Sequence, residues 1–199
     1  MELWAVIAWL GLCHALAILG LPVVTVLFGR FPDRGAAFAF PLAALVVTLT
    51  TYWIGQLSFG LVAIGGAVGG LLVVDLWLLL RRGVVPRIRS YVGPGLLFTV
   101  VFGAVVAIRA VDPAIYAHSG EMFLNFGLLK SLERASDLPP EDVWMAGEPV
   151  RYYYGGHLLG SVLAGLTTVP VRYAYNLHLP TIVATLATAS YGLAGAIGA

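Results

Sequence analysis

Apolar residues occur in long runs along this chain, separated by short polar connections and one long polar segment. A hydrocarbon core about 30 Å thick needs about 20 apolar residues in one helix. Six runs approach this length, and Asp75 is the only Asp, Glu, Lys or Arg residue within them. The pattern predicts six membrane-spanning helices, over Leu3–Phe28, Ala36–Gly55, Leu61–Leu80, Val92–Ile108, Tyr153–Val169 and Ala174–Ala199. Pro170 and Pro180 interrupt the pattern near the boundary between the last two runs.

The composition agrees with this pattern. Of the 199 residues, 60% are hydrophobic and only 11% are charged, whereas soluble domains carry roughly 25% charged residues. A net charge of +1 argues against a nucleic acid as a partner. The single cysteine, Cys13, has no second cysteine for an intrachain disulfide. We therefore expect an all-α, multi-pass protein of the cell membrane, with the lipid bilayer as its main partner.

The placement of arginines predicts an orientation, because cytoplasmic loops of membrane proteins carry an excess of Lys and Arg. Seven arginines follow the first, third and fifth runs, namely Arg30, Arg34, Arg81, Arg82, Arg87, Arg89 and Arg172. The connection at residues 56–60 carries no charge. If the arginines lie in the cytoplasm, the N-terminus lies outside and residues 109–152 form a large external loop. That loop holds seven acidic and four basic residues, which fits an external position.

The loop also divides the chain. Residues 1–91 are expected to form an N-terminal three-helix membrane unit. Residues 92–199 hold the fourth span, the external loop 109–152, and the fifth and sixth spans. The residues up to Ala199 stay apolar and end without a basic stop. The chain is thus expected to be an N-terminal fragment of a longer protein, with partner membrane helices supplied by its remainder or by another chain.

The first part of the external loop, Ser119–Ala135, has the pattern of an amphipathic helix. Ser119 is a suitable N-cap, and Glu121 lies in the first turn, where a carboxylate favours the helix dipole. Met122, Phe126 and Leu129 share one stripe. We expect this helix to lie in the membrane interface, with its apolar side toward lipid or toward the helix bundle. A simple connector helix is the alternative.

The second part of the loop runs from an extended, proline-stiffened segment, Leu138–Trp144, into a turn at Gly147–Pro149. Three consecutive tyrosines follow, and His157 lies four residues after Tyr153, beside the phenols on one helix face. Such a cluster is able to hydrogen-bond a sugar or a phosphate. An aromatic belt at the membrane surface is the alternative interpretation.

Three intramembrane features give further expectations. Asp75 precedes Arg81 by six residues and is expected to reach toward it. His178 is placed at the cytoplasmic start of the last span. Glycines in the third span repeat at a spacing of four, which predicts that Gly66 and Gly70 face another helix.

Several motifs occur together in a specific order. They are Phe31-Pro32-Asp33-Arg34-Gly35, Glu121 with Phe123 and Phe126, Pro139-Pro140 to Trp144-x-x-Gly147, and Tyr152-Tyr153-Tyr154-x-Gly156-His157. Together they resemble the archaeal and chloroflexal "YYY" membrane proteins, a family with a domain of unknown function, over essentially the whole chain. Full members of that family are longer and have more spans.

That family more remotely resembles the GT-C glycosyltransferases, which take sugars from polyprenyl-phosphate carriers at the external membrane face. GT-C enzymes carry an Asp or Glu in a large external loop, with an interfacial helix behind it. The resemblance therefore implies a GT-C-like fold for the fourth span, the loop and the fifth span. It also implies a glycosyltransferase that moves a sugar from a polyprenyl-phosphate carrier to an acceptor.

The same resemblance implies roles for individual residues. Glu121 would be the catalytic base, with Asp112 as the second candidate. Arg109 and Arg151 would bind the carrier phosphate, and the sugar pocket would be lined by Tyr152, Tyr153, Tyr154 and His157. Asn125 is a further substrate-binding candidate. Asn125 stands where the family has a second acid, on the same helical face as Glu121. No metal ligand is assigned. The cofactor stays open, and Asn125 weakens the case for a divalent metal.

Two other classes of function compete with this one. A lipid or polysaccharide transporter would account for the helices and tyrosines, but it should show broken helices or repeat symmetry, which the sequence does not display. A noncatalytic membrane assembly subunit would account for the fragment-like end and for Asn125.

Overall fold

The computed structural model describes residues 2–115 and 120–198. Within these ranges the chain forms α-helices and one short 3-10 helix, and no strand. The elements are α1 (Leu3–Leu27), η1 (Ala36–Phe38), α2 (Ala39–Gly55), α3 (Leu61–Arg81), α4 (Ile88–Val111), α5 (Gly120–Arg134), α6 (Gly155–Thr167) and α7 (Val171–Ile197). The predicted all-α class is therefore confirmed.

Five helices of the described chain are long and apolar enough to cross a membrane, namely α1, η1 with α2, α3, α4 and α7. The prediction of six such helices differs from the structure at the fifth run. That run forms α6, which has 13 residues and is therefore about 20 Å long at 1.5 Å per residue. This is shorter than the hydrocarbon core. The helix ends at Thr167, and Thr168 adopts a left-handed backbone with φ of 56°.

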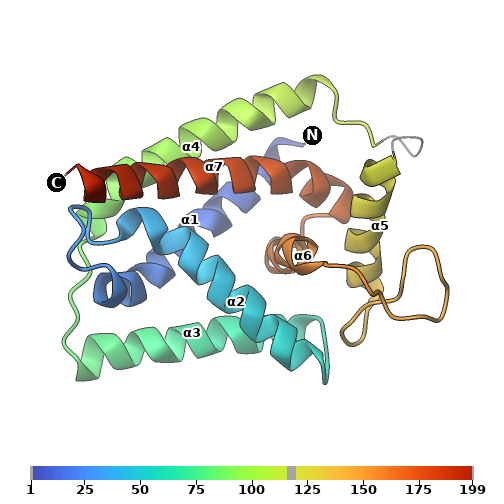
Figure 1. Cartoon of the computed structure of the whole chain (residues 1–199), viewed down its shortest axis with the longest axis horizontal. Helices are drawn as coiled ribbons and strands as arrows, with labels where there is room; N and C mark the ends of the chain where they lie inside the picture. Colours follow the sequence, from blue (N-terminus) through green and yellow to red (C-terminus); the bar gives the residue numbers. More distant parts are fainter. Residues whose placement is uncertain (1, 116–119, 199) are drawn as a thin grey trace.

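The long helices lie side by side, and the two ends of the bundle differ (Figure 1). α4 and α7 pack against each other, and α2 packs between α1 and α3. α5 runs across one end of the bundle, which we call the α5 end, and α6 is seen nearly end-on beside it. The connections that follow α1 and α3 lie at the opposite end, which we call the arginine end. It carries Arg30, Arg34, Arg81, Arg82, Arg87 and Arg89.

The short helix α6 also corrects the predicted position of Arg172. The chain leaves α4 and enters α7 at the same end of the bundle, because α6 does not cross it. Tyr173 Oη donates a hydrogen bond to Glu2 Oε1 at 2.6 Å, which joins the start of α7 to the N-terminus. Arg172 and His178 thus lie toward the α5 end and not toward the arginine end. Six arginines remain at the arginine end, so the charge bias that predicts the orientation is retained.

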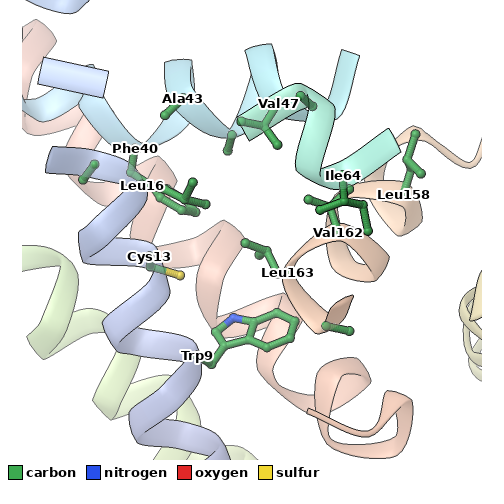
Figure 2. Packing of buried hydrophobic residues seen from close by; sticks show 14 of the residues in the cluster. Trp9, Cys13, Leu16, Phe40, Ala43, Val47, Ile64, Leu158, Val162 and Leu163 are labelled. Atoms are coloured by element: carbon green, nitrogen blue, oxygen red, sulfur yellow. The ribbon is translucent and has the colours of Figure 1, made fainter. Parts of the chain in front are cut away.

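The core lies where α1, α2, α6 and α7 meet (Figure 2). Trp9 of α1 and Leu163 of α6 are fully buried there. The indole Nε1 of Trp9 donates a hydrogen bond to Thr181 Oγ1 of α7 at 2.8 Å, so this buried polar pair is satisfied. The core draws on residues from both sides of residue 91. The division into two domains at that position stays a prediction.

The predicted loop helix is present as α5. Its apolar side, with Leu128, Leu129 and Leu132 fully buried, packs against α6 and α7. The apolar side was expected to face either lipid or the helix bundle, and in the structure it faces the bundle. Gly127 is also closely packed, since a Cβ there would lie 2.6 Å from Val143 Cγ1. The proposed N-cap, Ser119, lies outside the described residues.

The packing of α3 differs from the glycine-based prediction. A Cβ at Gly66 would meet Ile54 at 3.2 Å, but Gly70 has no atom within 4 Å of its Cβ position. Larger residues at a spacing of four, Ala63, Ala67 and Leu71, form the buried face instead and turn Gly70 outward. Asp75 continues this face. It is 3% exposed, and its carboxylate has no hydrogen-bond partner among the described residues, so the expected pairing with Arg81 is absent.

The Phe31–Gly35 motif has a structural role. The carboxylate of Asp33 accepts hydrogen bonds from the backbone N–H groups of Gly35 and Ala37, at 2.9 and 2.8 Å. Gly35 has a φ of 81°, a left-handed conformation that glycine adopts without steric cost. The motif therefore makes the tight turn between α1 and α2.

Cysteine labelling tests both the orientation and the position of α6. Ser136 and Ser90 lie at the α5 and arginine ends, and the exposed Thr168 lies beside Phe59 and Gly60 at the α5 end. We expect Ser136→Cys and Thr168→Cys to react with an impermeant thiol reagent in intact cells, and Ser90→Cys to react only after permeabilisation. Cys13 is buried and supplies the unreactive background. If only one of positions 168 and 136 is labelled in intact cells, the two lie on opposite sides of the membrane and the fold is contradicted. Labelling of position 90 in intact cells would reverse the orientation.

Candidate functional site

A pocket of about 480 Å³ lies at the α5 end, between α4, α5, α6 and α7. Its polar lining consists of Arg109, Asn125, His157, Tyr175 and His178, and its apolar lining of Met122, Leu129, Leu179 and Ile182. Leu179 and Ile182 are 58% and 41% exposed on the outer face of α7. The pocket therefore has polar groups beside an apolar wall that continues onto the side of the bundle.

Arg109 holds the start of the external loop against α7. Its guanidinium donates Nε–H to Asn176 Oδ1 at 2.8 Å, Nη1–H to the carbonyl of Asp112 at 2.7 Å, and Nη2–H to the carbonyl of Ala114 at 3.2 Å. Asn176 in turn donates Nδ2–H to the carbonyl of Pro113 at 3.0 Å. All these acceptors are neutral oxygens, and together they orient the guanidinium.

Asn125 and His157 are paired within the pocket. The Nε2 of His157 lies 3.1 Å from Asn125 Oδ1, across the contact between α5 and α6. Burial lowers the pKa of His157, because the charged imidazolium loses hydration. The other ring nitrogen, Nδ1, is buried and has no hydrogen-bond partner among the described residues. Arg109, Asn125 and His157, three of the residues expected to bind substrate, thus line one pocket, and their role in binding stays a prediction.

The three tyrosines and Arg151 are not among the residues that line this pocket. Tyr152 and Tyr153 stack on each other with ring centroids 3.9 Å apart, and Tyr152 Oη donates to Tyr153 Oη at 2.5 Å. Tyr154 packs near Tyr52 of α2, at 6.3 Å between centroids. Arg151 is exposed and forms a 3.7 Å ion pair with Glu148.

The two proposed catalytic acids lie near the pocket and not in its lining. Glu121 is exposed in the first turn of α5, directly before the lining residue Met122. The hydrogen bond to Tyr153 raises the pKa of Tyr152, and the nearby Glu121 carboxylate acts in the same direction. Asp112 contributes its carbonyl to Arg109, and its Oδ1 accepts from the backbone N–H of Ala114 at 3.2 Å.

Sequence analysis missed three residues that belong to this site. Tyr175, Asn176 and His178 lie in the first two turns of α7. The expected sixth span placed His178 on the other side of the membrane, and Tyr175 and Asn176 are not among the predicted site residues. The sequence does contain a signal that the fifth run is too short to cross the membrane. Only a short apolar run separates Gly155 from the segment Thr167–Pro170, where a helix is expected to end.

A second cavity, of about 560 Å³, lies between α5 and residues 139–146. Its carboxylates hold the loop together. Glu141 Oε1 accepts the backbone N–H of Gly147 at 2.7 Å, and Asp142 Oδ1 accepts that of Trp144 at 2.8 Å. Within the described ranges, no group of three or more His, Cys, Asp or Glu side chains is placed to hold a metal ion.

The long apolar helices and the pocket at one end of the bundle define a multi-pass α-helical membrane protein. Comparison with known families agrees with this class. The chain belongs to the family described as "Uncharacterized membrane protein (DUF2298)", whose sequence profile matches residues 46–199. The prediction of an uncharacterized family of membrane proteins is thereby confirmed. Neither the comparison with curated proteins nor that with solved structures gives a match.

The Arg109–Asn176 contact gives a stability prediction. Replacing Asn176 by Ala removes the acceptor of Arg109 Nε–H and the donor to the Pro113 carbonyl. Leaving buried polar groups unpaired costs about 1–3 kcal/mol, so we expect a lower melting temperature in detergent. Tyr153→Phe is the control, because that side chain is 78% exposed. Equal melting temperatures for Asn176→Ala and the wild type would show that this contact does not hold the loop.

Proposed function

We propose that this protein is a GT-C-like glycosyltransferase that moves a sugar from a polyprenyl-phosphate carrier to an acceptor hydroxyl. One observation carries the proposal. The cationic Arg109 and the apolar wall of Leu179 and Ile182 line the same pocket. A polyprenyl phosphate has the same division, with an anionic group joined directly to a long apolar chain. A guanidinium fork suits phosphate oxygens, and the described acceptors of Arg109 are an amide oxygen and two backbone carbonyls.

The position of the pocket also suits a substrate that arrives through the membrane. The apolar wall lies on the exposed side of α7, one of the five helices long enough to cross a bilayer. Arg109 lies at the end of α4, another of these helices. A carrier in the bilayer would therefore present its chain to Leu179 and Ile182 and its phosphate to Arg109, at the depth of the lipid headgroups. The charge bias of the connections supports an external position for this face.

In the proposed reaction, the acceptor hydroxyl oxygen forms a bond to the anomeric carbon of the sugar. The bond between that carbon and the phosphate oxygen breaks, and its electron pair stays on the carrier phosphate. The hydroxyl proton passes to a carboxylate, for which Glu121 is the first candidate and Asp112 the second. Arg109 stabilises the negative charge that develops on the departing phosphate.

Binding of polyprenyl phosphate to the protein in nanodiscs tests the phosphate site. A charge-assisted hydrogen bond contributes about 1.5–3 kcal/mol, so Arg109→Gln should weaken binding by roughly ten- to a hundredfold. Arg172→Gln is the matched control, because Arg172 is exposed near the same end and its guanidinium lies over the Tyr173 ring at 4.6 Å. Ile182→Trp, which fills the apolar wall without removing an Arg109 contact, should also weaken binding. Unchanged binding by both pocket variants would contradict the proposal.

Turnover of a polyprenyl-phosphate sugar by the protein in nanodiscs tests the catalytic assignment. A general base contributes roughly a hundredfold or more, so Glu121→Gln should lower the rate by that factor and leave the melting temperature unchanged. If Glu121→Gln keeps the wild-type rate while Asp112→Asn loses it, the two roles are reversed. Lipid binding without turnover would favour the noncatalytic subunit.

A further inference from the structure

The motif from Pro139 to Gly147 is not among the residues that line the pocket around Arg109. Most of it forms one wall of the second cavity, which we call the loop cavity, and α5 forms the facing wall. The loop that carries this motif extends beyond α5, away from the helix bundle (Figure 1). A ligand of the loop cavity would therefore arrive from the aqueous side and not through the lipid.

Hydrogen bonds within the described chain hold the loop wall of this cavity in place. Ser131 Oγ of α5 donates to the carbonyl of Glu141. The backbone N–H of Asp142 donates to the carbonyl of Glu148 at 2.8 Å, which closes the turn between them. The loop cavity is therefore preformed, and a preformed site loses less conformational entropy when a ligand binds.

Trp144 gives the loop cavity an exposed aromatic surface. Its side chain belongs to the cavity lining and is 66% exposed. The indole packs on the Phe123 ring, with centroids 5.0 Å apart, and Phe123 is itself 38% exposed. Asp142 Oδ1 accepts the backbone N–H groups of Trp144 and Met145 at 2.8 and 3.1 Å, which fixes the turn that carries the indole. Adjoining aromatic rings held open to water beside a cavity point to a ligand with an apolar face.

The charged groups of the cavity supply both donors and acceptors. Arg134 and Asp137 belong to the lining and are exposed, and neither side chain has a hydrogen bond or ion pair among the described residues. Lys130 is instead paired with Glu133 at 2.6 Å. Since a free guanidinium and a free carboxylate lie in one lining, neither an anion nor a cation is favoured. An uncharged ligand with several hydroxyl groups suits this combination better.

A carbohydrate has both features that the loop cavity requires. One face of a pyranose ring presents C–H groups, which pack on an aromatic ring as other apolar groups do. The rim of the same ring carries hydroxyl groups, each of which donates and accepts hydrogen bonds. The guanidinium of Arg134 is suited to donate to hydroxyl oxygens, and the carboxylate of Asp137 is suited to accept from hydroxyl hydrogens.

We propose that the loop cavity binds a carbohydrate chain from the aqueous side, with one sugar ring packed on Trp144 and its hydroxyl groups bonded by Arg134 and Asp137. The binding itself does not depend on the Arg109 pocket. The role of the bound chain rests on the proposed function, because in a glycosyltransferase this chain is the acceptor. The acceptor hydroxyl then belongs to a carbohydrate.

The position of the loop cavity supports the acceptor role. Met122 lines the Arg109 pocket, and the next residue, Phe123, supports the indole of Trp144. The two cavities therefore share the first turns of α5 and adjoin there. Glu121, the first candidate for the catalytic base, lies in the same turn.

Binding of neutral oligosaccharides to the protein in nanodiscs without polyprenyl lipids tests the carbohydrate site. The probes are hexasaccharides of glucose, mannose and N-acetylglucosamine, and the measurement is isothermal titration calorimetry. We expect at least one hexasaccharide to bind, and Trp144→Ala to weaken its binding roughly tenfold, because the packing on the indole is lost. Trp144→Phe should retain part of the affinity. Met145→Ala is the matched control, since Met145 is 65% exposed in the same turn but lies outside the cavity lining.

Two further variants test the hydrogen-bonding groups. Arg134→Gln and Asp137→Asn should each weaken binding of the same hexasaccharide roughly tenfold, because one charge-assisted hydrogen bond is lost. Both side chains are exposed, so the melting temperature in detergent should not change. Glu148→Gln is the control, because it removes a charge from the same loop outside the cavity lining.

The outcomes separate this proposal from the function on which the acceptor role rests. If no hexasaccharide binds, or if Trp144→Ala binds as tightly as Met145→Ala, the carbohydrate site is overturned, even where polyprenyl phosphate binds the Arg109 pocket. If a hexasaccharide binds as expected and polyprenyl phosphate does not bind, the carbohydrate site stands and the proposed function fails.

Discussion

The packing of the short helix α6 determines the geometry of the whole site. α6 contacts α1, α2, α5 and α7, and at 13 residues it cannot place its two ends on opposite sides of a membrane. Gly160 permits this packing, because a Cβ there would lie 3.2 Å from Leu129 Cδ2 and 3.3 Å from His178 Nδ1. With glycine at this position, α5 and α7 both approach α6 closely. The groups that line the pocket are thereby brought to one end of the bundle.

This constraint explains why polar residues gather at the start of α7. In a helix that entered from the other face, Tyr175, Asn176 and His178 would lie at the arginine end. Since α6 does not cross, they lie beside Arg109 at the end of α4, and Asn176 links the two helices through the guanidinium. The same contacts tie residues 112–114 to the bundle. The pocket thus combines a fixed cation, neutral hydrogen-bonding groups and an apolar wall within a short distance of the lipid phase.

Much of the fold was predictable from the sequence, because long apolar runs and amphipathic periodicity are strong signals. The four N-terminal spans and the loop helix were located within a few residues. α6 was not, because hydropathy alone does not tell a short buried helix from a spanning one, and the position of Arg172 and His178 was wrong as a consequence. The prediction that Gly70 faces another helix was wrong. The glycine spacing identifies one face of α3, but it does not tell whether that face packs against another helix. Arg109, Asn125 and His157 were among the predicted site residues. Their association with Tyr175 depends on contacts between helices that no local pattern encodes.

The most direct test of the account is an experimental structure of the protein in nanodiscs with a bound polyprenyl-phosphate sugar. We predict phosphate density within hydrogen-bond distance of the Arg109 guanidinium and the isoprenoid chain against Leu179 and Ile182. The helix α6 should still be short and buried. A lipid bound elsewhere, with the Arg109 pocket filled by protein side chains, would contradict the account.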